Sequence, residues 1–368
     1  MRQRFFFCIL IFFLGGCGNA PPDTADYSQM TNTELEAGPT TVWSPSTPAV
    51  TVEPTHSPTS SRTPVVPASS EPVAPSIEPD SGATLAFVGD IMLGRSLGAR
   101  IDRGEGDTIF ASVDIILQAA DLTIGNLECA LGTGGTKAPK AYTFLAPPEA
   151  ARLLRNAGFD LMSLANNHSL DYGLEVFDQT GKILTENGIR FIGAGADEIQ
   201  ARAPARFEAG GVRIALLAYA DVPVEYLSKF DARDWSAGPS TPGISWADDE
   251  KIKQDLLALD GEADLIVVLF HFGTEGLEAP DKRQIQLSRL AVDYGADVIV
   301  GSHPHMVQNV EQYKDGWIFY SLGNFVFDGF EGEANRSVIL WLTVSAEKEL
   351  AYSWMPLNIV DGIPRIGE

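Results

Sequence analysis

Short apolar runs alternate with amphipathic segments along most of the chain. Each run ends at a glycine or a polar residue or is followed directly by one, as buried strands of a parallel sheet are. The runs occupy residues 84–90, 120–128, 159–168, 189–195, 211–220, 263–273 and 296–305. Helical periodicity marks residues 147–158, 175–188, 248–260 and 281–295. This alternation predicts an α/β fold with helices on the faces of a sheet.

Two further β-rich runs, residues 317–327 and 337–345, follow without a helix between them. Strands that lack a crossover helix are expected to pair antiparallel, so the sheets should be mixed. No internal repeat interrupts this region, and we assign residues 83–368 to one domain.

The first residues differ from the rest of the chain. A basic start precedes the apolar stretch 5–14, and small residues then lead to Cys17. The pattern resembles a bacterial lipoprotein signal, so we expect residues 1–17 to be a signal peptide ending at a lipidated Cys17. An ordinary cleaved signal peptide and an uncleaved anchor are the alternatives. In the lipoprotein interpretation the protein is extracytoplasmic and held to a membrane.

Residues 18–82 contain about half of the 23 prolines, mixed with serine and threonine. This composition predicts a disordered, semi-extended spacer. The formal net charge of −23 argues against nucleic acid as a partner. It also disfavours binding of polyanions unless a bound cation offsets the repulsion.

Polar residues able to ligate metal stand where the predicted strands end. They are Asp90, Asn126, Glu128, Asn167, His168, His271, His303, His305, Asn324 and Asp328. Open α/β sheets build their sites at this edge, and four of the five histidines belong to the set. Mixed imidazole, carboxylate and amide ligands suit Mn, Fe, Zn or Mg. A divalent metal site is therefore predicted, and Pro304 is expected to hold its last two histidines on extended backbone.

Six ordered motifs carry a family resemblance, and they read FVGDIMLGR, GNLECAL, SLANNHSLDYG, HFGTEG, GSHPHMVQ and YSLGNFVFD. The chain resembles the CapA-type capsule synthesis (poly-γ-glutamate synthesis) family, which is related in fold to calcineurin-like metallophosphoesterases. The resemblance implies a four-layer αββα sandwich with mixed sheets and a site at one sheet edge.

The resemblance also implies roles for single residues. Asp90 corresponds to the first metal carboxylate, and either Asn126 or Glu128 to the second. Asn167 corresponds to the amide ligand and His168 to the neighbouring catalytic histidine that donates a proton. The later imidazole ligands correspond to His271, His303 and His305.

Two departures weaken the second metal position. Met92 stands where phosphoesterases usually carry a ligand histidine, and Asn126 lacks the charge of a bridging aspartate. We therefore expect one firmly held ion and a weak second position, because a two-metal clamp needs both positions filled.

Residues beside the metal set carry open alternatives. Arg95 is expected either to contact an anionic substrate or to pair with a nearby acid. We assign Arg95, Asn324 and Asp328 to substrate binding. Asp171 orients His168 or caps the following helix. Glu275 is a general base or a solvated loop acid.

Three functions fit this pattern. The first is a metal-dependent hydrolase or transferase that uses a metal-activated water on an anionic polymer such as poly-γ-glutamate. The second is a non-catalytic accessory subunit that binds the polymer beside membrane synthesis subunits. The third is a generic exported phosphoesterase.

Overall fold

The computed structural model describes residues 82–367. The predicted signal peptide, Cys17 and nearly all of the predicted spacer lie outside the described residues. Within them, no helix combines the length and apolar character needed to cross a membrane.

The larger sheet, here called sheet one, has eight strands in the order β18-β17-β16-β1-β2-β5-β6, with β15 paired to β1. Its strands are β1 (Gly82–Ile91), β2 (Leu122–Leu127), β5 (Leu161–Ser163), β6 (Arg190–Ile192), β15 (Asn324–Val326), β16 (Arg336–Ser345), β17 (Leu350–Val360) and β18 (Ile363–Arg365). Strands β1, β2, β5, β6 and β15 pair in parallel, whereas β16, β17 and β18 add antiparallel.

Sheet two has six strands in the order β13-β14-β12-β11-β9-β8. They are β8 (Ala205–Ala209), β9 (Val212–Asp221), β11 (Leu265–Phe272), β12 (Val298–Ser302), β13 (Val310–Tyr313) and β14 (Gly316–Phe319). Two small pairs join β3 (Ala130–Leu131) to β4 (Leu145–Ala146) and β7 (Ala194–Gly195) to β10 (Gly243–Ile244).

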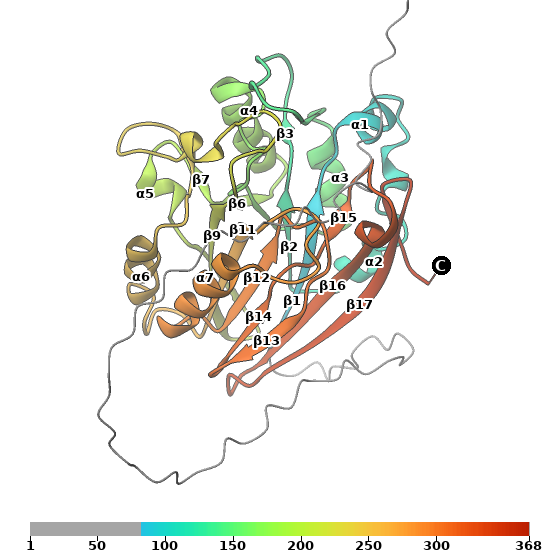
Figure 1. The fold of residues 1–368 in the computed structure, drawn as a ribbon. Coiled ribbons are helices and arrows are strands. Elements are labelled where there is room, and N and C mark those ends of the chain that lie inside the picture. Colours follow the sequence, from blue (N-terminus) through green and yellow to red (C-terminus); the bar gives the residue numbers. More distant parts are fainter. Residues whose placement is uncertain (1–81, 368) are drawn as a thin grey trace, which may run out of the picture. The chain divides into compact units, whose positions relative to one another are not determined.

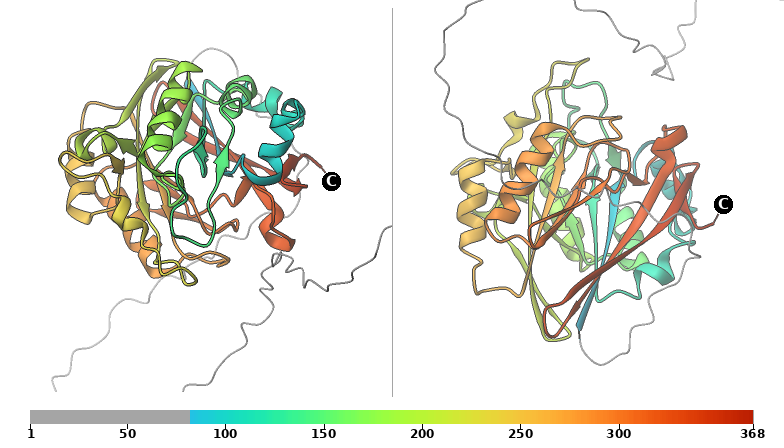
Figure 2. Two further views of the ribbon diagram at one scale, coloured as in Figure 1. Left: turned by 90° about the horizontal axis from the view of Figure 1, so that it is seen from above. Right: turned by 60° about the horizontal axis from the view of Figure 1, so that its bottom comes forward.

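Helices cover the outer faces of both sheets (Figures 1 and 2). They are α1 (Arg95–Asp102), α2 (Asp114–Leu117), α3 (Ala150–Ala157), α4 (Gly173–Glu186), α5 (Glu198–Ala201), α6 (Asp249–Leu257) and α7 (Lys282–Asp293). Short 3-10 turns are η2 (Gly106–Thr108), η3 (Ala232–Trp235) and η4 (Gly332–Asn335). The predicted helices at residues 147–158, 175–188, 248–260 and 281–295 correspond to α3, α4, α6 and α7.

Alternate residues of β9 show how the layers pack. Leu216 belongs to the core cluster shared with sheet one, whereas its neighbours Leu217 and Tyr219 pack in a second cluster with α6 and α7. Both faces of sheet two are therefore buried, one against the other sheet and one against helices. The predicted four-layer αββα arrangement with mixed sheets is confirmed.

The expected antiparallel pairing holds for residues 337–345, since β16 pairs antiparallel with β1 and β17. It holds only in part for residues 317–327, where β14 pairs antiparallel with β13 but its other neighbour is parallel. That run divides into β14, parallel to β12, and β15, parallel to β1. The chain crosses from sheet two to sheet one between these strands, so one apolar run contributes a strand to each sheet.

Candidate metal centre

The site lies between the two sheets, near the carboxyl ends of strands β1 and β11. Asp90 comes from β1, His271 from β11 and Asn324 from β15. Strand β1 reaches this point only because residue 89 is glycine: a Cβ there would lie 1.9 Å from the carbonyl oxygen of Gly323. The tight approach of β1 and the segment before β15 brings Asp90 and Asn324 into register.

The loop after β12 is bent, which contradicts the expected extended backbone. His303 and His305 have φ values of +95° and +57°. Such values cost roughly 1–3 kcal/mol for a residue with a side chain and persist only where surrounding contacts hold them. Both side chains are nearly fully buried, and the bend lets them face the ends of both sheets. Packing at the site outweighs the local preference set by Pro304.

Glu128 is the central residue of the site. Its side chain is fully buried, and neither carboxylate oxygen has a hydrogen-bond partner within the described residues. Its Oε1 lies 3.8 Å from Nε2 of His168, 3.9 Å from Nε2 of His271 and 3.8 Å from Nε2 of His305. The buried Nδ1 of His303 also lacks a partner there. Unpaired buried groups of this kind are costly, and a cation among them would satisfy both.

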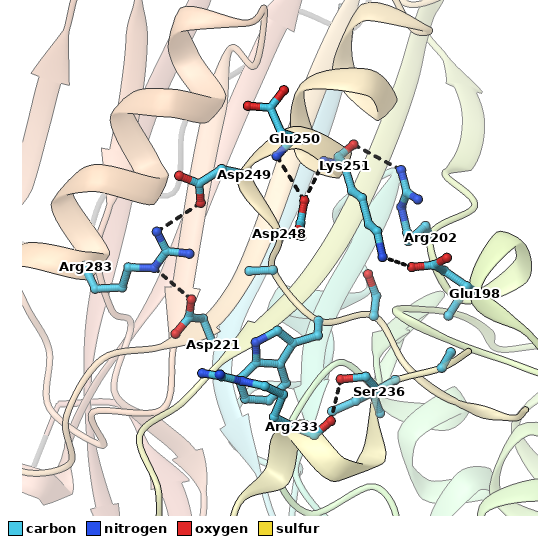
Figure 3. Close-up of a pocket in the computed structure, with 16 residues that line it drawn as sticks. Glu198, Arg202, Asp221, Arg233, Ser236, Asp248, Asp249, Glu250, Lys251 and Arg283 are labelled. Atoms are coloured by element: carbon cyan, nitrogen blue, oxygen red, sulfur yellow. Dashed lines mark hydrogen bonds and ion pairs between the residues drawn. The ribbon is translucent and has the colours of Figure 1, made fainter. Parts of the chain in front are cut away.

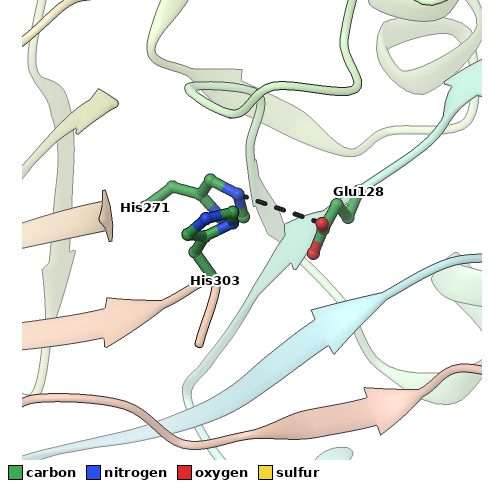
Figure 4. Close-up of side chains that lie close together, drawn as sticks. All are labelled: Glu128, His271 and His303. Carbon is green, nitrogen blue, oxygen red and sulfur yellow. Dashed lines mark ion pairs between the residues drawn. The ribbon is translucent and has the colours of Figure 1, made fainter. Parts of the chain in front are cut away.

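Three overlapping ligand groups share this space, each with ligand atoms within 4.8 Å of one another: Glu128, His271 and His303; Asp90, Glu128 and His305; Glu275, His303 and His305. Figure 4 shows the imidazoles of the first group facing the Glu128 carboxylate from the opposite sheet. The predicted carboxylates and imidazoles thus converge. Their mixture of nitrogen and oxygen donors fits a divalent cation.

Asn126 bonds to other members of the site. Its Nδ2 donates to Oδ1 of Asp90 at 2.8 Å, and its Oδ1 accepts from Nδ2 of Asn166 at 3.1 Å. The backbone N–H of His303 donates to Oδ2 of Asp90 at 3.2 Å, and Nδ1 of His305 lies 3.3 Å from the same oxygen. Of the two residues predicted for the second carboxylate position, Glu128 is the one with free oxygens. Sequence analysis missed Asn166, although it adjoins the predicted ligand Asn167.

His271 links several polar residues of the site. Its Nε2 lies 2.8 Å from Oδ1 of Asn167, and its Nδ1 lies 3.0 Å from Oγ of Ser302 and 3.1 Å from Nδ2 of Asn126. With Asn126 donating to Nδ1, neutral His271 carries its proton on Nε2 and donates it to Asn167. Cation binding at Nε2 requires the other neutral tautomer, with the proton on Nδ1 beside Oγ of Ser302.

Burial controls the charge states of the site. It raises the pKa of Glu128 well above its usual value, with the nearby Asp90 carboxylate adding to the effect. Burial lowers the pKa of His271 and of His303 well below 6.5, and neighbouring imidazoles lower it further. Burial also lowers the pKa of His305, but the contact of this imidazole with Asp90 has the larger effect, so the pKa of His305 is raised. His271 and His303 are therefore neutral near pH 7, the form that binds metal.

Asp171 orients His168. Its Oδ2 lies 2.7 Å from Nδ1 of His168 and accepts the backbone N–H of Phe144 at 2.6 Å. Helix α4 begins after Tyr172 without a side-chain cap, so the capping alternative for Asp171 is wrong. The ring of Phe144 stacks on that of His168, with centroids 4.2 Å apart. These contacts leave Nε2 of His168 facing Glu128.

Lys140 supports this arrangement from behind, and its burial could not be foreseen from the sequence. Its side chain is 0 % exposed, and Nζ lies 3.1 Å from Oδ1 of Asp171 and 3.2 Å from Oε1 of Glu225. It also contacts the backbone oxygen of Asn167 and lies 5.3 Å from the ring of Trp235. Lys140 joins three loops around the site.

The predicted substrate residues lie at the edge of the site. Nε of Arg95 lies 3.0 Å from Oδ1 of Asp328, so Arg95 pairs with a nearby acid, and its side chain remains 38 % exposed. Asn324 is fully buried, with Oδ1 2.8 Å from Nδ1 of His305. Glu275 is exposed, yet its carboxylate reaches the imidazoles of the last ligand group. Substrate contact by Arg95, Asn324 and Asp328 stays a prediction.

Comparisons with known proteins identify the family. A family model described as "Bacterial capsule synthesis protein PGA_cap" matches residues 84–329. The chain belongs to this family. It is 34% identical to the "Capsule biosynthesis protein CapA" of Bacillus anthracis over 77% of this chain and 69% of that protein. It is also 34% identical to the "PGA biosynthesis protein CapA" of Bacillus subtilis, over 77% and 74% of the two chains.

More distant proteins are similar to the chain as well. A "Probable polyglutamine synthesis accessory protein" of Mycobacterium tuberculosis is 28% identical over 62% of each chain. A solved structure of a hypothetical protein from Thermus thermophilus aligns with a TM-score of 0.48 at 15% identity, over 75% of this chain and 99% of that one. The matched residues 84–329 contain every residue of the candidate metal centre.

Proposed function

We propose that this PGA_cap protein is a metal-dependent hydrolase or transferase that acts on an anionic polymer such as poly-γ-glutamate. The observation that carries the proposal is the fully buried, unpaired Glu128 carboxylate among three imidazoles. A buried carboxylate without a partner is costly in a purely structural role, and a bound cation removes that cost.

Glu128, His271 and His303 would hold the ion, with Asp90, His305 and the amide oxygen of Asn167 as further donors. When bound, a divalent cation supplies Lewis acidity, which activates water and polarises the bond under attack. Manganese, iron, zinc and magnesium all remain compatible with this donor set.

His168 is proposed to move the proton. Burial lowers its pKa, and the neighbouring Asp171 charge only partly opposes this, so the resting imidazole is neutral near pH 7. Because Asp171 holds Nδ1 at 2.7 Å, Nε2 is free to accept a proton from the attacking water and return it to the leaving group. His168 would therefore act first as a base and then as the expected proton donor.

The polymer and the location are also proposals. The names of the two Bacillus relatives refer to capsule and PGA biosynthesis, which favours an anionic polymer as the substrate here. The basic and apolar start of the chain followed by Cys17 favours an extracytoplasmic protein held to a membrane by lipid, beside membrane synthesis subunits.

The test uses the full-length chain purified in detergent, with metal content measured by mass spectrometry and turnover measured on poly-γ-glutamate and on a phosphodiester. We expect about one ion per wild-type chain, and at least roughly tenfold weaker retention in Glu128→Gln. His168→Gln should keep the ion and lose turnover. Glu186→Gln, on the exposed face of α4, is the matched control and should change neither. Equal metal content in wild type and Glu128→Gln would overturn the proposal.

A non-catalytic, polymer-binding accessory role is the second candidate. Met92 is fully buried, and its Sδ accepts the backbone N–H of Gly94 at 3.1 Å, so this side chain offers nothing to a second hard cation. Polymer binding that a chelator abolishes, without turnover of either substrate, would favour this role. Turnover of the phosphodiester alone would favour a generic phosphoesterase.

A further inference from the structure

A polar cavity of about 640 Å³ lies on the helix-covered side of sheet two (Figure 3). Arg233, Ser245, Trp246, Asp221 and Arg283 are among the residues that line it. None of them belongs to the candidate metal centre.

The cavity is close to the metal centre. Asp221 ends β9 and is in register with Phe272, the residue after the predicted ligand His271. The 3-10 turn η3 lies between the two places: its Trp235 ring is 5.3 Å from Nζ of Lys140, whereas its Arg233 lines the cavity. The 3-10 turn η3 therefore connects the lining of the cavity to Lys140, which supports the residues that position His168.

Most charged groups of the cavity are paired with each other. Arg283 binds Asp221 at 2.9 Å and Asp249 at 3.0 Å. Lys251 contacts Glu198, and Arg202 binds Asp255 at 2.7 Å. These pairs need no ligand.

Arg233, an exposed residue, is the lining cation that has no such partner. Its guanidinium makes no hydrogen bond or ion pair with any residue of the described region and lies 5.5 Å from the ring centre of Trp246. The neighbouring Asp221 is engaged by Arg283 instead, as the dashed lines in Figure 3 show. Ser245 is 2 % exposed, and its Oγ also lacks a partner in this region. An exposed cation, a buried hydroxyl and an indole thus line the same cavity, and neither the cation nor the hydroxyl has a hydrogen-bond partner among the described residues.

We propose that this cavity is a carboxylate subsite for the polymer processed at the metal centre, with Arg233 as its receptor. The inference rests on the proposed function. A guanidinium binds a carboxylate through two parallel hydrogen bonds, and the indole of Trp246 packs against the methylene groups of the chain. A polymer with a carboxylate on every repeat offers further carboxylates besides the one nearest the metal centre. In a chain with net charge −23, an unpaired arginine is a local attraction for such a polyanion.

The test measures binding of a fluorescently labelled γ-linked oligoglutamate to the full-length protein by anisotropy. Loss of a charge-assisted hydrogen-bonded pair predicts about tenfold or weaker binding for Arg233→Gln. Arg233→Lys keeps the charge without the fork and should fall between the two. Arg206→Gln is the matched control, since Arg206 is exposed on β8 away from the cavity lining and should leave binding unchanged. Metal content should be equal in all four proteins.

The outcomes separate this inference from the proposed function. Oligomer binding that is equal in wild type and Arg233→Gln overturns the subsite and leaves the polymer proposal standing. Absence of oligomer binding by wild type overturns both. Free glutamate that binds wild type as tightly as the oligomer, with the same dependence on Arg233, also overturns the subsite, because the cavity would then receive a monomer.

Discussion

Replacing Lys140 with methionine tests whether its buried ion pairs hold the site together. Methionine keeps most of the apolar volume of the lysine stem and removes the ammonium group. The Asp171 side chain is 0 % exposed and that of Glu225 is 21 % exposed, so both carboxylates would lose their cation with little water to replace it.

The expected loss can be estimated from what each carboxylate keeps. Breaking a buried ion pair by removal of one partner costs about 3–5 kcal/mol. Asp171 would still accept the N–H of Phe144 at 2.6 Å, and Glu225 would still accept the hydroxyl of Ser228 at 2.6 Å. These remaining bonds put the loss near the lower end, at about 3 kcal/mol, which is a large part of the roughly 5–15 kcal/mol that stabilises a typical domain.

Urea unfolding of the metal-free protein, followed by circular dichroism, measures this loss. Lys182→Met is the control, because Lys182 is 71 % exposed and its ion pair with Glu186 spans 4.0 Å, so we expect a change within about 0.5 kcal/mol. Adding Glu225→Gln to Lys140→Met should recover part of the loss, since one uncompensated charge is removed. A loss below about 1 kcal/mol in Lys140→Met would refute the assigned role of these pairs.

Three further predictions concern charge, catalysis and location. Burial holds the pKa of His303 well below 6.5 in the folded chain. The unfolded chain therefore binds an extra proton below pH 6.5, and metal-free wild type should lose stability on acidification by up to about 1.4 kcal/mol per pH unit from this group. Urea titrations between pH 6.5 and 5.5 should show a shallower pH dependence for His303→Asn, and parallel slopes would count against this. Asp171→Asn should keep the metal and lower turnover roughly 10–100-fold in the same assays, since His168 loses its charged partner; equal loss of metal and turnover would contradict this. Cys17→Ser should move the protein from the membrane fraction to the soluble fraction on immunoblots, and unchanged membrane retention would argue against lipid attachment at Cys17.

Much of the site was predictable because strand ends are visible in the sequence. An apolar run followed by a polar residue marks both the end of a buried strand and the sheet edge where ligands bind. Asp90, Glu128 and His271 each follow such a run, and the structure brings their side chains together from two different sheets. The sequence could not show which sheet each strand joins, and the run 317–327 serves both.

Contacts between distant loops were not predictable. Lys140 and Glu225 are 85 positions apart, and no local pattern distinguishes a buried lysine from a solvated one. The direction of the Asn126 amide was equally hidden, because it depends on Asp90 of β1 and on Asn166 in the segment after β5. Side-chain hydrogen bonds of this kind are fixed by the assembled fold.

The charge of the buried site favours one divalent ion over two. Asp90 and Glu128 are both fully buried, and with both carboxylates ionised they would balance the charge of one divalent ion in a region where an unbalanced charge is costly. Asn126 stands where an aspartate would add a third buried negative charge, and its amide instead donates to Asp90 at 2.8 Å. Within the ligand groups found among residues 82–367, the one further carboxylate that could balance a second divalent ion is that of the exposed Glu275. Two substitutions, Asn126 and the buried Met92, thus act in the same direction, and both support a single ion per chain.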